Sequence, residues 1–290
     1  MLKFKNISKN YKAIKALKNV SFSIPENSIF GILGANGSGK STFMKILPGL
    51  IYDWSGEIYY HQKLINQKDM LLKKDFGYLI ESPTFYEYLS ARNNLEMLAR
   101  ISKVSINRIE YVLDLVNLKK RCDDKVHTYS YGMKQRLGIA QTLLHDPSVI
   151  ILDEPNNGLD PNGIDDMNQL IKKLKSEGKT ICLSTHNLKD VEQICTHFTI
   201  FKEGKNSVAT SMEEQFKNSN KWLISINNAA LAKTKIEESK VFKVIKVLNQ
   251  SILIESKSTD TFNELNQILS GIEIYKINKE SNLIEYFKND

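Results

Sequence analysis

One short segment constrains the fold of this chain more than any other. It runs Gly34-Ala-Asn-Gly-Ser-Gly-Lys-Ser41, directly after the apolar run Ile29–Leu33 and ahead of a predicted helix. Its glycines let the backbone wrap so that successive N–H groups point inward, and the helix adds its positive N-terminal end. The segment therefore predicts a cradle for phosphate groups at the end of a buried strand.

The residue types in this loop indicate what it holds. Lys40 is expected to reach the β and γ phosphates of a nucleotide, and the Ser41 hydroxyl is expected to bind Mg²⁺. A Gly-rich turn without a ligand is the alternative interpretation. The candidate nucleotide-binding residues of the loop are Gly34, Asn36, Gly37, Ser38, Gly39, Lys40, Ser41 and Thr42.

Two adjacent carboxylates follow a second apolar run. Val149–Leu152 has the pattern of a strand buried on both faces, and Asp153 and Glu154 come directly after it. Ligands of open α/β sheets bind at this end of the strands. We expect Asp153 to hold Mg²⁺ and Glu154 to accept a proton from the water that attacks the γ-phosphoryl group. A helix cap would explain the pair alone, but the phosphate loop in the same chain favours catalysis.

Three further segments make the interpretation specific to one family. They are Tyr129-Ser-Tyr-Gly-Met-Lys-Gln-Arg136, Pro155-Asn-Asn-Gly-Leu-Asp-Pro161 and Ser184-Thr-His186. In this order they resemble the signature motif, the D-loop and the switch histidine of ABC ATPases. Taken singly, each segment also fits a purely structural role: a helix N-cap for Ser130, a turn over residues 158–161 and a core histidine at position 186.

The resemblance covers about residues 1–210 and implies a mechanism. In ABC ATPases two such domains meet head to tail and hold ATP between them. This implies a homodimer on ATP binding and adds Ser130, Gly132 and Asp160 to the nucleotide site. His186 is then expected to act with Glu154 in catalysis.

The same resemblance implies partners and a location. The partners are integral membrane permease subunits, so the chain is expected at the cytoplasmic face of the cell membrane, attached through them. Tyr11, ahead of the first expected strand, looks like the aromatic residue on which such domains stack adenine. A core tyrosine is the alternative for that position.

One position departs from the common family pattern. Most members carry a glutamine where this chain has Glu81, between Leu79-Ile80 and Ser82-Pro83. A carboxylate only accepts hydrogen bonds, but it is a good oxygen ligand for Mg²⁺. This glutamate, with Tyr131 and Met133 in the signature segment, resembles the branch of bacitracin-resistance and lantibiotic-immunity ATPases. We expect Glu81 to help bind the metal and to couple the nucleotide state to the membrane partner; a surface carboxylate is the alternative.

The branch resemblance predicts the ATP-hydrolysing subunit of a multisubunit exporter that protects against a lantibiotic or similar membrane-active peptide. The alternatives are the ATPase of another two-component exporter, a nutrient importer subunit, or an ABC ATPase acting on nucleic acid or ribosomes. The net charge of +7 is spread along the chain, with one ATPase domain and no concentrated basic tail. We therefore expect no nucleic-acid partner.

The remaining patterns predict an α/β fold of two domains. The expected class is a P-loop ABC-type ATPase with a mixed, mainly parallel sheet, including strands at 19–24 and 180–184, and a helical insertion at about 86–146 with helices at 91–101 and 106–118. Residues 218–290 predict a small α+β domain. Its order is β-α-β-β-α-β, as in ferredoxin-like folds, with elements at 222–226, 229–238, 241–248, 251–255, 262–269 and 272–277.

Cysteine spacing argues against disulfides and a zinc site, and hydropathy argues against a membrane-spanning segment. Cys122, Cys182 and Cys195 are far apart and form no C-x-x-C pair, so neither a disulfide framework nor a zinc site is expected. Apolar runs stay well short of the roughly 18–20 residues that span a bilayer. Any work at a membrane is therefore expected to go through partner subunits.

Overall fold

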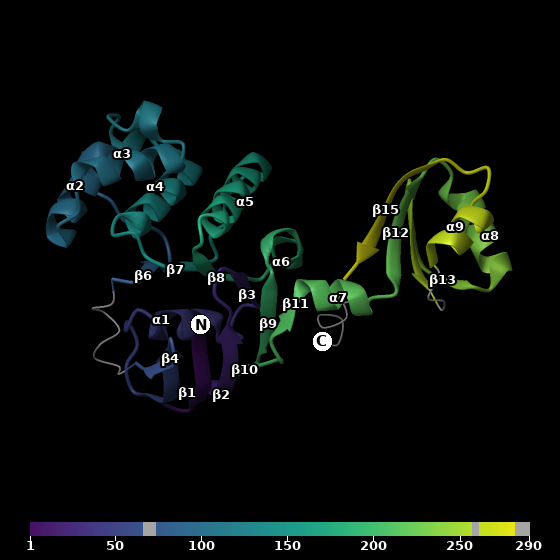
Figure 1. The fold of residues 1–290 in the computed structure, drawn as a ribbon, viewed down its shortest axis with the longest axis horizontal. Coiled ribbons are helices and arrows are strands. Elements are labelled where there is room, and N and C mark those ends of the chain that lie inside the picture. Colours follow the sequence, from purple (N-terminus) through teal and green to yellow (C-terminus); the bar gives the residue numbers. More distant parts are fainter. Residues whose placement is uncertain (66–73, 257–260, 282–290) are drawn as a thin grey trace. The chain divides into compact units, whose positions relative to one another are not determined.

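The chain forms two compact units, Met1–Thr210 and Ser211–Asp290. We describe them from a computed structural model, which covers residues 1–65, 74–256 and 261–281 (Figure 1). Within these residues, no helix is both long and apolar enough to cross a membrane.

The central sheet of the first unit is mixed and mainly parallel. In order across the sheet it contains β10 (Lys205–Asn206), β9 (His197–Lys202), β3 (Ile29–Leu33), β8 (Thr180–Thr185), β7 (Val149–Asp153) and β6 (Phe76–Leu79). Neighbouring strands from β9 to β6 are parallel, and β10 is antiparallel to β9. Every residue of β3, β7 and β8 is buried, which confirms the prediction of strands covered on both faces.

A second, antiparallel sheet is formed by strands that lie on both sides of β3 in the chain. Across the sheet the order is β2 (Ile14–Ile24), β1 (Leu2–Tyr11), β4 (Trp54–Tyr60) and β5 (Lys63–Leu64). The sequence predicts only residues 19–24 of it and places Tyr11 ahead of the first strand. That placement is wrong, because Tyr11 ends β1 and pairs with Ile14. A register shift between Phe4 and Ile7 breaks the alternation by which β1 could have been found.

An aromatic cluster joins the two sheets to the helix after the phosphate loop. That helix is α1 (Lys40–Ile46), and its Phe43 ring lies 4.8 Å from Phe4 of β1 and 5.5 Å from Phe201 of β9, measured between centroids. Phe22 of β2 stacks on Phe30 of β3 at 5.2 Å. Burying these rings fixes α1, and therefore the loop that precedes it, against the central sheet.

Helices cover the other face of the central sheet. Successive strand residues point to opposite faces, and Gly31, next to Phe30, faces Val191 and Cys195. The helices on that side are α5 (Pro161–Ser176) and α6 (Leu188–Ile194). The chain between β6 and β7 forms a helical layer (Figure 1) of α2 (Ala91–Ser102), α3 (Ile106–Leu115), η2 (Lys119–Arg121), η3 (Val126–Thr128) and α4 (Tyr131–Leu143).

The helix expected at 106–118 ends early. Asn117 adopts a left-handed conformation with φ 57°, and the N–H of Leu118 donates to the carbonyl of Leu113 at 2.8 Å. This backbone arrangement closes the end of α3 after Leu115, while Leu118 stays buried by continuing into the turn. Its apolar side chain therefore continues the helical pattern in the sequence, although the helix itself has ended at Leu115.

The second unit follows the short strand β11 (Thr210–Ser211), which lies at the boundary between the units. It contains α7 (Met212–Asn218), β12 (Lys221–Ile226), α8 (Ala229–Ser239), β13 (Phe242–Leu248), β14 (Ser251–Ser256), α9 (Thr261–Ile268) and β15 (Ile274–Glu280). The order from β12 is the β-α-β-β-α-β order expected from the sequence. Its sheet runs β13–β14–β12–β15 and is antiparallel throughout. The unit has its own apolar core, which includes Ile224, Ile236, Ile252, Ile254 and Leu265.

Candidate active site

The phosphate loop closes tightly around the Lys40 side chain. Lys40 begins α1, is only 4% exposed, and its Nζ donates to the carbonyls of Gly34 at 2.8 Å and Ala35 at 3.2 Å. Two positions in the loop require glycine. A Cβ on Gly34 would lie 2.4 Å from the carbonyl oxygen of Phe201, and Gly39 adopts a left-handed backbone conformation with φ 109°. The loop thus holds an ammonium group at its centre.

A hollow beside this loop is lined by most of the candidate nucleotide-binding residues of the loop. Its walls also include Lys15 and Lys18 of β2. The Ser38 hydroxyl is buried in the loop and finds no hydrogen-bond partner among the described residues. Cationic walls and an unused donor suit phosphate oxygens. From the loop, the hollow is lined by Asn36, Gly37, Gly39, Lys40, Ser41 and Thr42.

The predicted catalytic residues meet at the carboxyl ends of β7 and β8. Glu154 follows β7, and its carboxylate lies 3.6 Å from Lys40 Nζ and 2.9 Å from His186 Nδ1. The Glu154 side chain is 19% exposed, so the lysine and the histidine hold it at the edge of solvent. The His186 side chain is 49% exposed, which shows that the alternative of a core histidine is wrong.

Sequence reasoning missed a serine that contacts both of the adjacent acidic residues. Ser184 is fully buried; its hydroxyl donates to the Asp153 carboxylate and accepts from the backbone N–H of Glu154 at 3.0 Å. Burial raises the pKa of Asp153, and the hydrogen bond from Ser184 opposes that rise. The Ser-Thr-His segment contains the signal, but its use depends on β7 and β8 being neighbours.

Tyr11 is available for contact with a ligand. It is 42% exposed, so the alternative of a core tyrosine is wrong. The Lys9 ammonium lies 5.1 Å from its ring centroid and also donates to the carbonyls of Tyr52 at 2.5 Å and Asp53 at 3.3 Å. Lys9, a second residue that sequence reasoning missed, therefore anchors the end of β1 that carries Tyr11.

The signature residues lie apart from the phosphate loop within one chain. Ser130, Gly132 and Asp160 line a separate hollow between the start of α4 and the start of α5. Ser130 caps α4 by accepting from Met133 N at 3.3 Å, and Asp160 caps α5 by accepting from Gly163 N at 2.8 Å. The helix cap that was the alternative interpretation of Ser130 is therefore present. The first residues of α4 also line the hollow.

Glu81 is held by a residue that the sequence did not single out. Its carboxylate lies 2.5 Å from Lys45 Nζ on α1, and the hydrogen bond from Lys45 lowers the pKa of Glu81. The side chain is 66% exposed. In the described part of the chain, no group of three His, Cys, Asp or Glu side chains could hold a metal alone.

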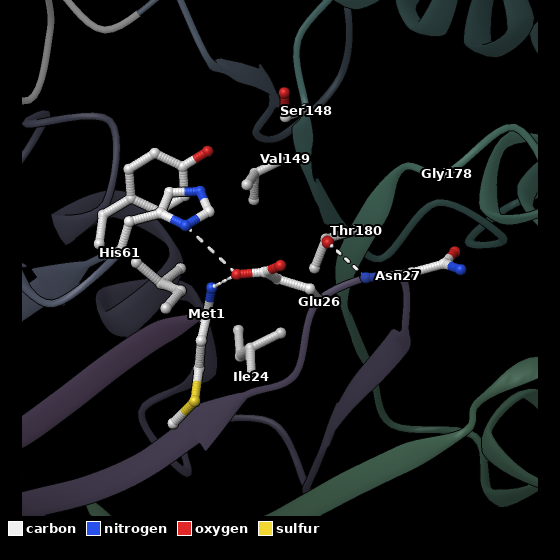
Figure 2. Close-up of a pocket in the computed structure, with 11 residues that line it drawn as sticks. Met1, Ile24, Glu26, Asn27, His61, Ser148, Val149, Gly178 and Thr180 are labelled. Carbon is white, nitrogen blue, oxygen red and sulfur yellow. Dashed lines mark hydrogen bonds and ion pairs between the residues drawn. The ribbon is translucent and has the colours of Figure 1, made fainter.

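A third hollow lies at the opposite edge of the central sheet, where β7 and β8 begin (Figure 2). It is lined by Glu26 and Asn27 ahead of β3 and by Val149 and Thr180 at the starts of β7 and β8. Glu26 pairs there with His61 at 3.2 Å. The predicted site residues all lie elsewhere, so the candidate chemistry gathers at the carboxyl ends of the strands.

Comparison with known proteins decides the family. The ABC transporter family pattern matches residues 17–157. The lantibiotic transport ATP-binding protein SrtF of Streptococcus pyogenes is 40% identical over 205 residues, 71% of this chain and 88% of that protein. The bacitracin transport ATP-binding protein BcrA of Bacillus licheniformis is 34% identical over 294 residues, 99% of this chain and 96% of that protein. The chain belongs to the ABC transporter ATP-binding family.

A solved structure supports the same assignment. The dimeric ATP-binding cassette MJ0796, in a post-hydrolysis state bound to ADP and Pi, is 28% identical with a TM-score of 0.65. The match covers 73% of this chain and 99% of that one. The fold of this ABC ATPase and its resemblance to the bacitracin and lantibiotic branch are thus confirmed, and the chain is an ATP-hydrolysing enzyme. ABC cassettes of this kind form dimers and act with membrane permease subunits.

Proposed function

We propose that this ABC ATPase drives a multisubunit exporter that protects the cell against a lantibiotic or a similar membrane-active peptide. The relatives named for lantibiotic and bacitracin transport support the substrate class, and BcrA matches the chain through its C-terminal unit as well. The observation that carries the ATPase activity is the placement of Glu154 between Lys40 and His186.

Glu154 is suited to act on the attacking water. Phosphoryl transfer needs mainly positioning and charge stabilisation, together with a group that orients the nucleophile. His186 and Lys40 hold the two carboxylate oxygens of Glu154 from different sides, which fixes the direction in which the carboxylate can accept a proton. When nucleotide enters, Lys40 can exchange its two loop carbonyls for phosphate oxygens.

The residues present fit Mg²⁺. The donor set consists of the Ser41 hydroxyl and the Asp153 carboxylate, with Glu81 as a third candidate, and all are the hard oxygen ligands that Mg²⁺ prefers. When bound, the ion would neutralise charge on the phosphates. Because Mg²⁺ usually takes one or two carboxylates plus substrate phosphates, a complete protein cage is not required.

The separate signature hollow supports a head-to-tail dimer as the hydrolysing form. Ser130, Gly132 and Asp160 lie outside the hollow of the phosphate loop in one chain, and in a head-to-tail dimer they would face the nucleotide of a second copy. The exposed start of α4 offers N–H and hydroxyl donors to a γ-phosphate. Tyr11 would stack on the adenine ring.

The experiment compares survival of a peptide-sensitive bacterium that expresses the chain with its neighbouring membrane-protein genes. The variant Glu154→Gln is the comparison, and lantibiotics and bacitracin are the challenges. Protection by the wild type that the variant loses would support an ATP-driven immunity exporter in which this chain is attached, through its partner subunits, to the cytoplasmic face of the membrane. Equal survival with every peptide, although the purified chain hydrolyses ATP, would contradict the immunity role and favour assignment of the chain to another two-component exporter.

A further inference from the structure

The pair formed by Lys45 and Glu81 joins two parts of the active site. Lys45 lies in the last turn of α1, and its Nζ is 2.5 Å from the Glu81 carboxylate. The hydrogen bond to Glu81 raises the pKa of Lys45, and the charge of Asp153 acts in the same direction. The ammonium group therefore lies in the field of both carboxylates that are candidates for the metal site.

The position of Lys45 on its helix brings in the third candidate ligand. Lys45 follows Ser41 by four residues, so the two side chains share one face of α1, one turn apart. Lys45 thus pairs with Glu81, lies in the field of Asp153 and shares a helix face with Ser41, and these are the three oxygen groups proposed for Mg²⁺. With its side chain 32% exposed, Lys45 can swing toward solvent.

This arrangement explains physically why a glutamate suits position 81, where most of the family has a glutamine. The glutamine common in the family could accept a hydrogen bond from Lys45, but it would bring no charge to balance the ammonium. Glu81 has φ 65°, a conformation that non-glycine residues rarely adopt, so its loop gains from a partner that fixes it. Among the described residues, Lys45 is the ion-pair partner of Glu81.

We propose that Lys45 is a positioning residue that holds Glu81 against α1 and competes with Mg²⁺ for its carboxylate. The inference rests on the proposed role of Glu81 as a metal ligand. Arrival of the metal with its nucleotide would release Lys45 from Glu81. The Glu81 segment would then change its attachment, from the phosphate-loop helix to the metal, each time nucleotide binds.

A double-mutant cycle on the full-length chain tests this. A fluorescent, non-hydrolysable ATP analogue is titrated with Mg²⁺ into the wild type, Lys45→Met, Glu81→Gln and the double variant. We expect Lys45→Met to lower the Mg²⁺ concentration for half-maximal binding by roughly two- to fivefold, the range for a partly exposed ion pair. In the Glu81→Gln background the same change should have no effect.

The controls separate the possible outcomes. Lys45→Arg should behave like the wild type, and Lys172→Met on the exposed side of α5 should show whether loss of one charge alone shifts the titration. An equal shift from Lys45→Met in both backgrounds, or a rise in the Mg²⁺ requirement, would overturn the inference. Absence of nucleotide binding by the wild type would instead overturn the proposed function itself.

Discussion

At the scale of single residues, the site depends on buried groups that hold the reacting ones. Ser184 contacts Asp153 through its hydroxyl hydrogen and the Glu154 backbone through its oxygen. One buried side chain therefore holds the Asp153 carboxylate and the backbone of the adjacent Glu154. Its removal leaves a buried carboxylate without its neutral donor, which is more costly than the loss of an exposed hydrogen bond.

We predict that Ser184→Ala lowers the free energy of unfolding by about 1–3 kcal/mol, because the Asp153 carboxylate and the Glu154 N–H lose a partner. ATP hydrolysis should fall by up to roughly 10²-fold through misplacement of Glu154. Denaturant unfolding and phosphate release measure the two effects. Ser176→Ala, at the exposed end of α5, is the matched control, and equal behaviour of the two variants would contradict the prediction.

Residue types and spacing were enough to propose the candidate catalytic groups. The phosphate loop and the segments that carry Glu154 and His186 could be predicted because each follows an apolar strand, and parallel strands end at one edge of a sheet. Ser184, Lys9 and Lys45 could not be assigned a role in this way. Their function depends on which elements become neighbours, and a single sequence does not give that directly.

At the scale of elements, the D-loop packs against the start of the signature helix. Gly158 has φ 75°, and a Cβ there would lie 3.2 Å from the ring of Tyr131. Tyr131, where the family usually has glycine, thus covers the D-loop within the same chain. The left-handed backbone favours a glycine at this point, and the ring leaves little room for a Cβ.

We predict that Gly158→Ala destabilises the protein by roughly 1–2 kcal/mol from the left-handed backbone alone, with a further cost from the clash with Tyr131. Gly178→Ala is the control, because Gly178 has φ 88° but open space around its Cβ position. Thermal unfolding of both variants measures the difference. If Gly178→Ala proves as damaging as Gly158→Ala, the Tyr131 contact contributes nothing.

Asp146 links the helical layer to Lys179, the residue directly before β8. Its carboxylate accepts from Lys179 Nζ at 2.7 Å and Arg108 Nη2 at 2.8 Å. The hydrogen bond from Lys179, with the charge of Arg108, lowers the pKa of Asp146 below its usual 3.8. A carboxyl group whose pKa is lower in the folded than in the unfolded protein stabilises the fold at pH values above its unfolded-state pKa. That stabilisation is lost as the pH falls through the folded-state pKa.

We therefore predict that Asp146→Asn costs roughly 0.2–1 kcal/mol at pH 7, since the pairs are partly exposed and screened. The difference from the wild type should shrink as the pH falls below about 4. Urea unfolding over a pH series measures it, with Asp165→Asn on the exposed side of α5 as control. A difference that persists unchanged at low pH would contradict the ionic explanation.

The elements themselves were predicted unevenly, for physical reasons. Strands buried on both faces, such as β7 and β8, appear as continuous apolar runs and could be found. β1 could not, because a bulge interrupts its alternation, and the end of α3 was misplaced because Leu118 continues the apolar pattern beyond the helix. In the second unit β14 alternates regularly, and the element order was predicted correctly although β13 contains a register shift between Val244 and Lys246.

At the scale of the whole molecule, two separate apolar cores account for two compact units. The first is built around the aromatic cluster next to α1, and the second lies between the sheet and the helices of residues 211–290. Because the described site residues all belong to the first unit, we propose that the second unit is not needed for basal ATP hydrolysis. Dimer contact or regulation is the role we propose for it.

We predict that Ile254→Ala, in the second core, destabilises its own unit by about 2–5 kcal/mol and leaves nucleotide binding by the first unit unchanged. Ile151→Ala is the matched change in the first core and should weaken nucleotide binding. Hydrogen exchange measures the stability of each unit separately. Loss of nucleotide binding in Ile254→Ala would show that the two units are coupled.

The most direct test of the proposed catalytic site is phosphate release by purified wild type and Glu154→Gln, with nucleotide binding measured in parallel. We predict that the variant binds ATP as the wild type does and hydrolyses it roughly 10²- to 10⁴-fold more slowly. Glu238→Gln on the exposed side of α8 should match the wild type in both measurements. Hydrolysis at the wild-type rate by Glu154→Gln would contradict the assignment of Glu154 as the catalytic base.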